Sequence, residues 1–153
     1  MIIELLKRGN IWYDVPGKNV TDVLSAVVQT VPFPPTLNQD ILLSAMLERE
    51  AFMPTAVGKG IAMPHPRNPL VNRDEDQLIS ILFLQCEVDW KALDGIPVST
   101  VMLIISASAK QHVQTLSYLS FFCQHEAYRN LLTRRSSQEE IVQYMERVEK
   151  TWL

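Results

Sequence analysis

The segment Gly58–Arg67 (GKGIAMPHPR) places one histidine, His65, between two prolines and shortly after two glycines. Proline fixes the φ angle and lacks an amide donor, whereas glycine allows backbone conformations and close approaches that other residues resist. Neighbours of this kind favour a loop over a helix. The segment therefore predicts that the imidazole of His65 is held in a loop and presented at the surface, where it can react.

Nucleophilic attack on phosphorus is a reaction that these residue types suit. A neutral imidazole, with an ordinary pKa of ~6.5, keeps a free lone pair near neutral pH, and its attack gives a covalent phosphohistidine. Such a site needs donors directed at the phosphoryl oxygens, because its work is positioning and charge stabilisation. Candidate donors are Arg49, Thr55 and the backbone near Gly58 and Gly60. Which ring nitrogen reacts depends on the hydrogen bond made by the other nitrogen, and the sequence leaves this open.

Hydrophobic spacing predicts the elements that must position this loop. Strands are predicted over Ile11–Val15, Leu78–Gln85 and Ser99–Ala107, one or two helical turns over Met1–Lys7, and helices over Asn19–Thr30, Asn38–Phe52, Lys110–His125, Tyr128–Leu132 and Ser136–Lys150. Two of the strands are apolar on both faces, which indicates a sheet covered from two sides. We therefore expect an α/β layered domain, with Trp12 and Trp90 packed against the sheet.

Composition limits the class of protein. The 153 residues are 47% hydrophobic and 20% charged, which suits one domain spanning residues 1–153. The net charge is −3 and no cluster of Lys and Arg is larger than a pair such as Arg134–Arg135, so nucleic acid is not the expected partner. No apolar run approaches the roughly 20 residues of a membrane helix, and we expect a cytoplasmic protein. Cys86 and Cys123 lack metal-ligand spacing; we expect buried, reduced thiols and no metal or cofactor.

The run REAFMPTAVGKGIAMPH resembles the active-site signature of the type-2 EIIA domain of the bacterial phosphoenolpyruvate-dependent sugar phosphotransferase system (PTS), the mannitol/fructose and nitrogen-regulatory EIIA family. The family pattern runs RE, then T, then GxG, then A, one residue and PH. Its eight positions are filled by Arg49, Glu50, Thr55, Gly58, Gly60, Ala62, Pro64 and His65. The resemblance extends over nearly the whole chain. It implies a mannitol-EIIA-like fold, a mixed central sheet of about five strands with helices on both faces.

The resemblance also implies roles for individual residues. His65 is the implied phosphorylated residue, receiving its phosphoryl group from phospho-HPr, and the family favours its Nε2 atom. His112, in HVQTLSYLS, matches a second family histidine that begins a later helix and helps to hold the phosphoryl group. Arg49 is implied to act electrostatically on the phosphate, with Thr55 and the glycines as support.

Other readings of the same residues stay open. His112 could be a solvated residue at a helix start, and Arg49 could pair with Glu48 or Glu50. His125 matches nothing in the family pattern and is expected to be solvated or structural.

Two residues after the signature depart from the family pattern. Members commonly carry glycine after the PH pair, whereas this chain has Pro66 followed by Arg67. Pro66 offers no amide to a phosphate. Arg67 adds a cation that could stabilise phosphorylated His65 or meet an acidic partner. The segment PHPRNPL is similar to a subgroup of EIIA-like domains taken to be regulatory.

We therefore expect a phosphocarrier that accepts a phosphoryl group from phospho-HPr on His65. It would either pass the group to a separate EIIB protein or use it as a regulatory signal toward a target protein. The alternative is a purely regulatory protein-binding module of the nitrogen-regulatory type, without a part in sugar transport. A binding fold whose histidine no longer reacts is disfavoured by the intact signature.

Overall fold

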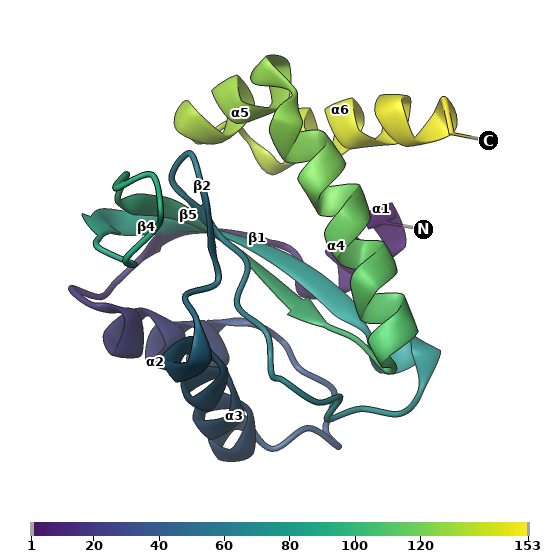
Figure 1. The fold of residues 1–153 in the computed structure, drawn as a ribbon. Coiled ribbons are helices and arrows are strands. Elements are labelled where there is room, and N and C mark those ends of the chain that lie inside the picture. Colours follow the sequence, from purple (N-terminus) through teal and green to yellow (C-terminus); the bar gives the residue numbers. More distant parts are fainter. Residues whose placement is uncertain (1, 153) are drawn as a thin grey trace.

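A five-stranded mixed sheet forms the centre of the computed structural model, which describes residues 2–152 (Figure 1). The strands are β1 (Ile11–Val15), β2 (Ala56–Gly58), β3 (Ile61–Ala62), β4 (Leu78–Val88) and β5 (Val98–Ile105). Their order across the sheet is β1-β4-β5-β3-β2. The β1–β4 and β3–β5 pairs are parallel, whereas the β4–β5 and β2–β3 pairs are antiparallel. The predicted mixed sheet of about five strands is confirmed.

Helices cover both faces of this sheet (Figure 1). The α-helices are α1 (Ile2–Gly9), α2 (Val20–Thr30), α3 (Gln39–Phe52), α4 (Ala109–Gln124), α5 (Glu126–Thr133) and α6 (Gln138–Lys150), with a 3₁₀ turn, η1, over Asp74–Asp76. Helices α2 and α3 pack on one face, and the other four lie on the opposite face. Side-chain oxygens of Asn19, Asn38 and Ser137 accept amide hydrogen bonds at the starts of α2, α3 and α6, which explains where these helices begin.

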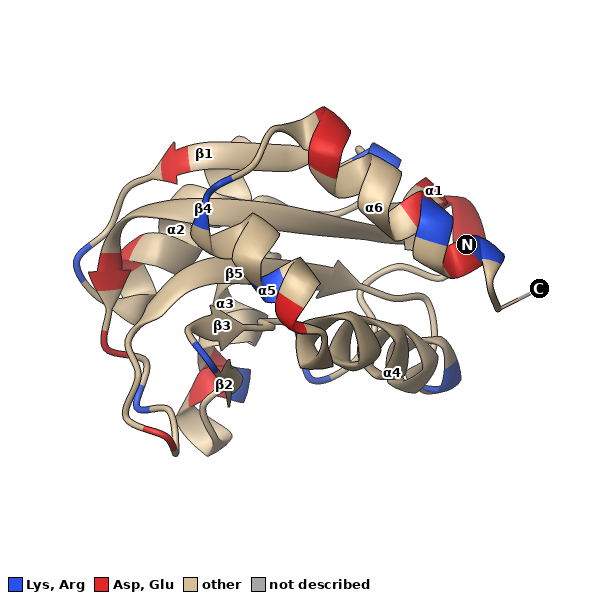
Figure 2. Ribbon diagram, turned by 90° about the horizontal axis from the view of Figure 1, so that it is seen from above, with Lys and Arg blue, Asp and Glu red and all other residues tan. Residues whose placement is uncertain are grey.

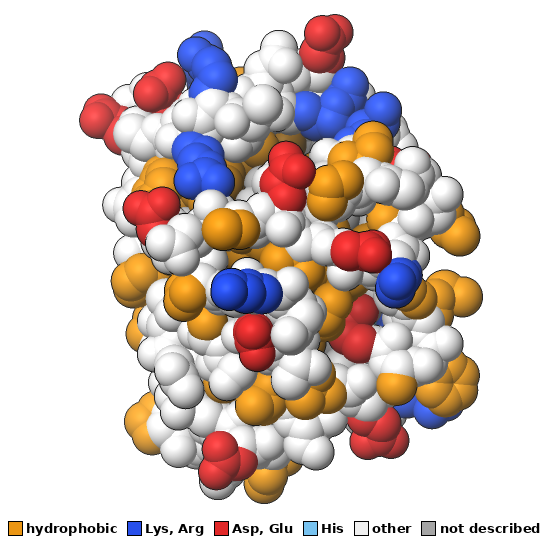
Figure 3. All heavy atoms as spheres, turned by 90° about the vertical axis from the view of Figure 1, so that its left-hand side faces the viewer, with side chains coloured by type: hydrophobic (Ala, Val, Ile, Leu, Met, Phe, Trp, Pro, Cys, Tyr) orange, Lys and Arg blue, Asp and Glu red, His pale blue; other side chains and the backbone are white. Residues whose placement is uncertain are grey.

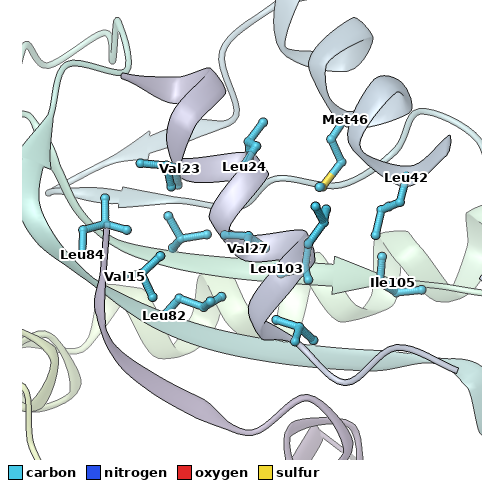
Figure 4. Packing of buried hydrophobic residues seen from close by; sticks show 14 of the residues in the cluster. Val15, Val23, Leu24, Val27, Leu42, Met46, Leu82, Leu84, Leu103 and Ile105 are labelled. Carbon is cyan, nitrogen blue, oxygen red and sulfur yellow. The ribbon is translucent and has the colours of Figure 1, made fainter. Parts of the chain in front are cut away.

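The alternation of side chains along β4 divides the core into two layers. Leu78, Leu82 and Leu84 belong to the layer beneath α2 and α3, which Figure 4 shows from close by. Ile79, Ile81 and Phe83 belong to the layer on the opposite face. Successive residues of a strand point to opposite faces, so a strand apolar at every position needs a cover on both sides. The two-sided strands predicted from the sequence are confirmed.

Two expectations about single residues have different outcomes. Trp90 is 1% exposed and packs in the layer beneath α2 and α3, as predicted. The expectation of mostly buried cysteines is wrong for Cys86, which is exposed, and Cys123 is half-buried. Cys86 follows the apolar part of β4, where residues 85–87 are exposed although the strand continues to Val88. The sequence prediction ended this strand at Gln85 because polar residues follow.

Basic and acidic residues are interspersed along the helices and loops (Figure 2). The face drawn in Figure 3 carries basic and acidic side chains separated by hydrophobic ones, without a continuous basic surface. Within residues 2–152, no helix combines the length and the apolar composition needed to cross a bilayer.

Candidate active site

The parallel pairing of β3 and β5 brings the two predicted histidines together. The carboxyl ends of parallel strands meet at the same edge of a sheet. His65 lies three residues after β3, in a segment still tied to β5 because the amide of Ile104 donates to the carbonyl oxygen of Pro64 (3.2 Å). His112 lies near the start of α4. This helix follows β5 after a short connection, and Ser108 caps its first turn. Residues far apart in the sequence therefore meet beyond these two strand ends.

The rings of His65 and His112 are in contact. Their centroids are 4.3 Å apart and their planes are inclined by 46°. His65 is 9% exposed, less than the surface presentation expected from its loop, and His112 is half-buried. The reading of His112 as a solvated helix-start residue does not fit this contact.

One hydrogen bond determines which nitrogen of His65 is free. Its Nδ1 atom lies 2.9 Å from the carbonyl oxygen of Met63. A carbonyl oxygen only accepts, so Nδ1 carries the hydrogen and donates it, and Nε2 keeps an unshared lone pair. Sequence reasoning left the choice of nitrogen open, and the backbone of the same PH loop supplies the answer.

Burial and charge keep both rings neutral at neutral pH. Burial is the main cause that lowers the pKa of His65; the Arg49 guanidinium lowers it further, whereas the Met63 carbonyl and the Glu50 carboxylate raise it. Burial, followed by the neighbouring His65 and Arg49, lowers the pKa of His112 to about 4. A neutral His65 is nucleophilic, and a neutral His112 can donate one N–H to an anion beside it.

Arg49 is held at the end of α3. Its guanidinium donates to the carbonyl oxygen of Met53 (2.6 Å), and the following residue, Pro54, disfavours further helix. None of the ion pairs in the described part of the chain joins Arg49 to Glu48 or Glu50, the alternative that the sequence left open. The guanidinium is close enough to both site histidines to lower their pKa values.

Glu50 connects three segments beneath the site. Its carboxylate accepts the backbone amide of Thr55 (2.9 Å), the hydroxyl of the same residue, and the indole N–H of Trp90 (3.0 Å). The hydroxyl of Thr55, a predicted phosphate donor, is therefore engaged with Glu50. The sequence did not predict the hydrogen bond from Trp90 to Glu50, because the two residues are 40 positions apart.

Gly58 and Gly60 form the tight turn between β2 and β3. Their φ angles are +94° and +80°, and Lys59 between them has a φ of +58°, so three consecutive residues adopt a conformation that favours glycine. The amide of Lys59 donates to Asp94 (2.7 Å), and a Cβ atom at Gly58 would approach the same carboxylate to 3.0 Å. The turn thus contacts the β4–β5 connection and also β5, whose Ser99 and Thr100 amides donate to the Gly60 carbonyl oxygen (2.9 and 3.1 Å). Its predicted part in phosphate binding stays a prediction.

Arg67 is exposed, and its guanidinium carbon lies 4.5 Å from the centroid of the Phe52 ring. Phe52 and Met53, at the end of α3, are 72% and 65% exposed, and Val113, beside His112, is 62% exposed. Large apolar side chains exposed together around a site are typical of protein–protein contact.

Comparisons of sequence identify the family of this chain. The family model described as "Phosphoenolpyruvate-dependent sugar phosphotransferase system, EIIA 2" matches residues 4–148. A nitrogen regulatory protein of Pseudomonas aeruginosa is 27% identical over 143 residues, which cover 92% of this chain and 91% of that protein. The PTS fructose-specific EIIA component of Haloferax volcanii is 31% identical over 68% of this chain and 67% of its own length.

Comparisons of structure show the same fold. Nitrogen regulatory protein IIA-Ntr from Neisseria meningitidis superposes with a TM-score of 0.80 and 23% identity, covering 94% of this chain and 98% of that one. The mannitol EIIA of Escherichia coli, in a complex with phosphorylated mannitol EIIB, gives a TM-score of 0.67 and 20% identity, covering 90% and 94%. The chain therefore belongs to the type-2 EIIA family of the phosphoenolpyruvate-dependent sugar phosphotransferase system.

Proposed function

We propose that residues 1–153 act as one EIIA unit that accepts a phosphoryl group on Nε2 of His65 from phosphorylated HPr, in the cytoplasm. The observation that carries this proposal is the hydrogen bond from Nδ1 of His65 to the Met63 carbonyl oxygen (2.9 Å). It leaves the other ring nitrogen as a lone-pair donor on a neutral ring.

The proposed step needs no further reactant. The Nε2 lone pair attacks the phosphorus of phospho-HPr and forms a P–N bond, while the bond from phosphorus to the donor atom breaks and its electron pair stays on HPr. Nδ1 keeps its hydrogen, so the ring of His65 gains positive charge as the bond forms. The Met63 carbonyl, which accepts this hydrogen, stabilises that charge.

His112 and Arg49 are proposed to hold the transferred group. The ring of His112 lies 4.3 Å from that of His65, close enough for its N–H to reach a phosphoryl oxygen on Nε2. The guanidinium of Arg49 acts on the same charge through space. A phosphoryl group carries roughly −1.5 to −2 charges, so its arrival favours the protonated form of His112 and raises that pKa.

The fate of the phosphoryl group divides the proposal into two branches. Transfer to a separate EIIB is supported by the fructose EIIA relative and by the mannitol EIIA–EIIB complex. Regulation of a target protein is supported by the nitrogen regulatory relative and by the Pro66–Arg67 departure, which places a cation against Phe52 beside the site. The exposed apolar side chains around the site suit a protein partner in either branch.

Incubation of the purified chain with Enzyme I, HPr and labelled phosphoenolpyruvate tests the proposal. We expect one acid-labile phosphate per chain, absent from His65→Ala. Label that persists in His65→Ala contradicts the proposed site. Addition of candidate EIIB proteins then separates the branches: loss of label to one of them supports transport, and its retention with all of them supports regulation.

A further inference from the structure

We infer that Glu50, Thr55 and Trp90 form a positioning network that holds the Met63 carbonyl against Nδ1–H of His65 and supports the positive charge that the ring gains during transfer. The inference rests on the proposed function. It concerns residues that do not themselves touch the phosphoryl group, and one of them, Trp90, lies outside the signature.

The Glu50 carboxylate is the fixed end of this network. It accepts three hydrogen bonds, from the amide and the hydroxyl of Thr55 and from the indole of Trp90. Thr55 is 5% exposed and Trp90 is 1% exposed. A carboxylate that accepts several hydrogen bonds from buried donors has little freedom to rotate.

A continuous series of hydrogen bonds joins this carboxylate to the reacting ring. The Nδ1–H of His65 donates to the carbonyl oxygen of Met63 (2.9 Å), and the amide of Met63 donates to the carbonyl oxygen of Thr55 (3.0 Å). The amide and hydroxyl of Thr55 donate in turn to Glu50. Every donor in the series points toward the carboxylate. The amide and the carbonyl of one residue belong to different peptide groups, so the series fixes the position of the Met63 carbonyl, and the negative charge of Glu50 acts on the ring through space.

The arrangement compensates for Arg49. That guanidinium disfavours positive charge on His65, whereas the Glu50 carboxylate and the Met63 carbonyl favour it. His112, the remaining titratable group in contact with the ring, is neutral at pH 7 because its pKa is about 4. A site that must bind an anion through Arg49 and also stabilise an imidazolium needs both charges. Glu50 supplies the negative one without competing for the phosphoryl oxygens.

A purely structural role is the alternative, because the same bonds tie the end of α3 to the start of β2 and to the β4–β5 connection. Three substitutions separate the two roles. Thr55→Val removes the hydroxyl and keeps the shape and both backbone bonds, and Thr55→Ser restores the hydroxyl. Trp90→Phe removes the indole N–H and keeps a buried aromatic ring.

The experiment measures two quantities in each protein, with Glu50→Gln added as the variant that removes the charge. Nitrogen-15 NMR of unphosphorylated protein reports the tautomer of His65, and rapid-quench transfer from phospho-HPr gives kcat and KM. We expect a single Nδ1–H form in the native protein and in Thr55→Ser. Thr55→Val, Trp90→Phe and Glu50→Gln keep the Met63 carbonyl and should keep this tautomer, but they should shift the His65 ring signals and lower kcat by up to about tenfold, with KM within about twofold.

Unchanged His65 signals and unchanged kcat in Thr55→Val and Glu50→Gln overturn the inference, while labelling of His65 in the same samples leaves the proposed function standing. If the native protein takes no label, the result contradicts the proposed function instead. Reduced folding stability with native His65 signals and native kcat also overturns the inference, since it leaves the network with a structural role only.

Discussion

Two histidines of this chain make the same hydrogen bond in different surroundings. Nδ1 of His65 lies 2.9 Å from the carbonyl oxygen of Met63, and Nδ1 of His125 lies 2.8 Å from that of Phe121. A carbonyl oxygen only accepts, so Nδ1 carries a hydrogen in each ring. His65 is buried against His112, whereas His125 is exposed at the end of α4. The hydrogen bond that orients the reacting ring of the proposed site is thus present twice.

The difference between the two regions lies in what surrounds the free nitrogen. Beside His65 are a second imidazole, the Arg49 guanidinium and the Glu50 carboxylate. The ring nearest to His125 is Phe121, at 4.6 Å between centroids. Phosphoryl transfer depends on positioned donors and fixed charges. An imidazole bound to a carbonyl oxygen is therefore not enough to indicate a phosphoryl-transfer site. The polar groups around its other nitrogen are also needed.

The largest expected effect is a complete difference in phosphorylation between His65 and His125. After incubation with phospho-HPr, peptide mapping should find phosphate on His65 and none on His125, because His65 has a second imidazole in contact with it and the Arg49 guanidinium nearby. His125→Gln should keep the native rate, whereas His65→Gln should take no label. Phosphate on His125 in either protein would show that the shared hydrogen bond suffices.

His112→Ala should give the next largest effect. Loss of one positioned donor typically costs about 2.7–4 kcal/mol where the site is well organised, and about the lower end of that range is expected here because His112 is half-buried. We therefore predict a kcat about a hundredfold lower, measured by rapid-quench transfer. Exposed His125→Ala, at the opposite end of the same helix, is the matched control. Equal rates in both variants would remove His112 from the site.

The pH dependence of transfer should show the effect of burial on His65. Attack requires the neutral ring, and the pKa of His65 lies below its ordinary value, mainly because of burial. The rate should therefore persist as the pH falls through ~6.5, the ordinary pKa of histidine, and decline only at lower pH. Single-turnover rates between pH 7.5 and pH 5, together with an NMR titration of His65, check this. A midpoint at or above the ordinary value would contradict the burial of the ring.

Short sequence patterns predicted the helices, the strands and the signature residues, whereas contacts between distant residues could not be predicted. The two-sided β4 and β5, the capped helices and the order of residues in the signature are encoded within short windows, so they could be predicted. The Glu50–Trp90 bond could not, because its partners lie 40 residues apart and meet only through the β4–β5 connection. The Met63 carbonyl is backbone and has no sequence signal. The low exposure of His65 depends on His112, from a different element.

The smallest predicted effect concerns stability in acid. In the folded chain the pKa of His112 is about 4, whereas an imidazole in the unfolded chain titrates near ~6.5. Between these values the unfolded chain binds more protons, so the free energy of unfolding falls as the pH is lowered through this window and is unaffected by this group above it. His112→Gln removes this contribution. Urea unfolding at pH 7.5 and pH 5 should show a smaller loss of stability in the variant. Part of the loss remains because the lowered pKa of His65 acts in the same direction. An equal loss in both proteins would mean that His112 titrates in the folded chain as it does in the unfolded one, which would contradict the burial of its ring beside His65.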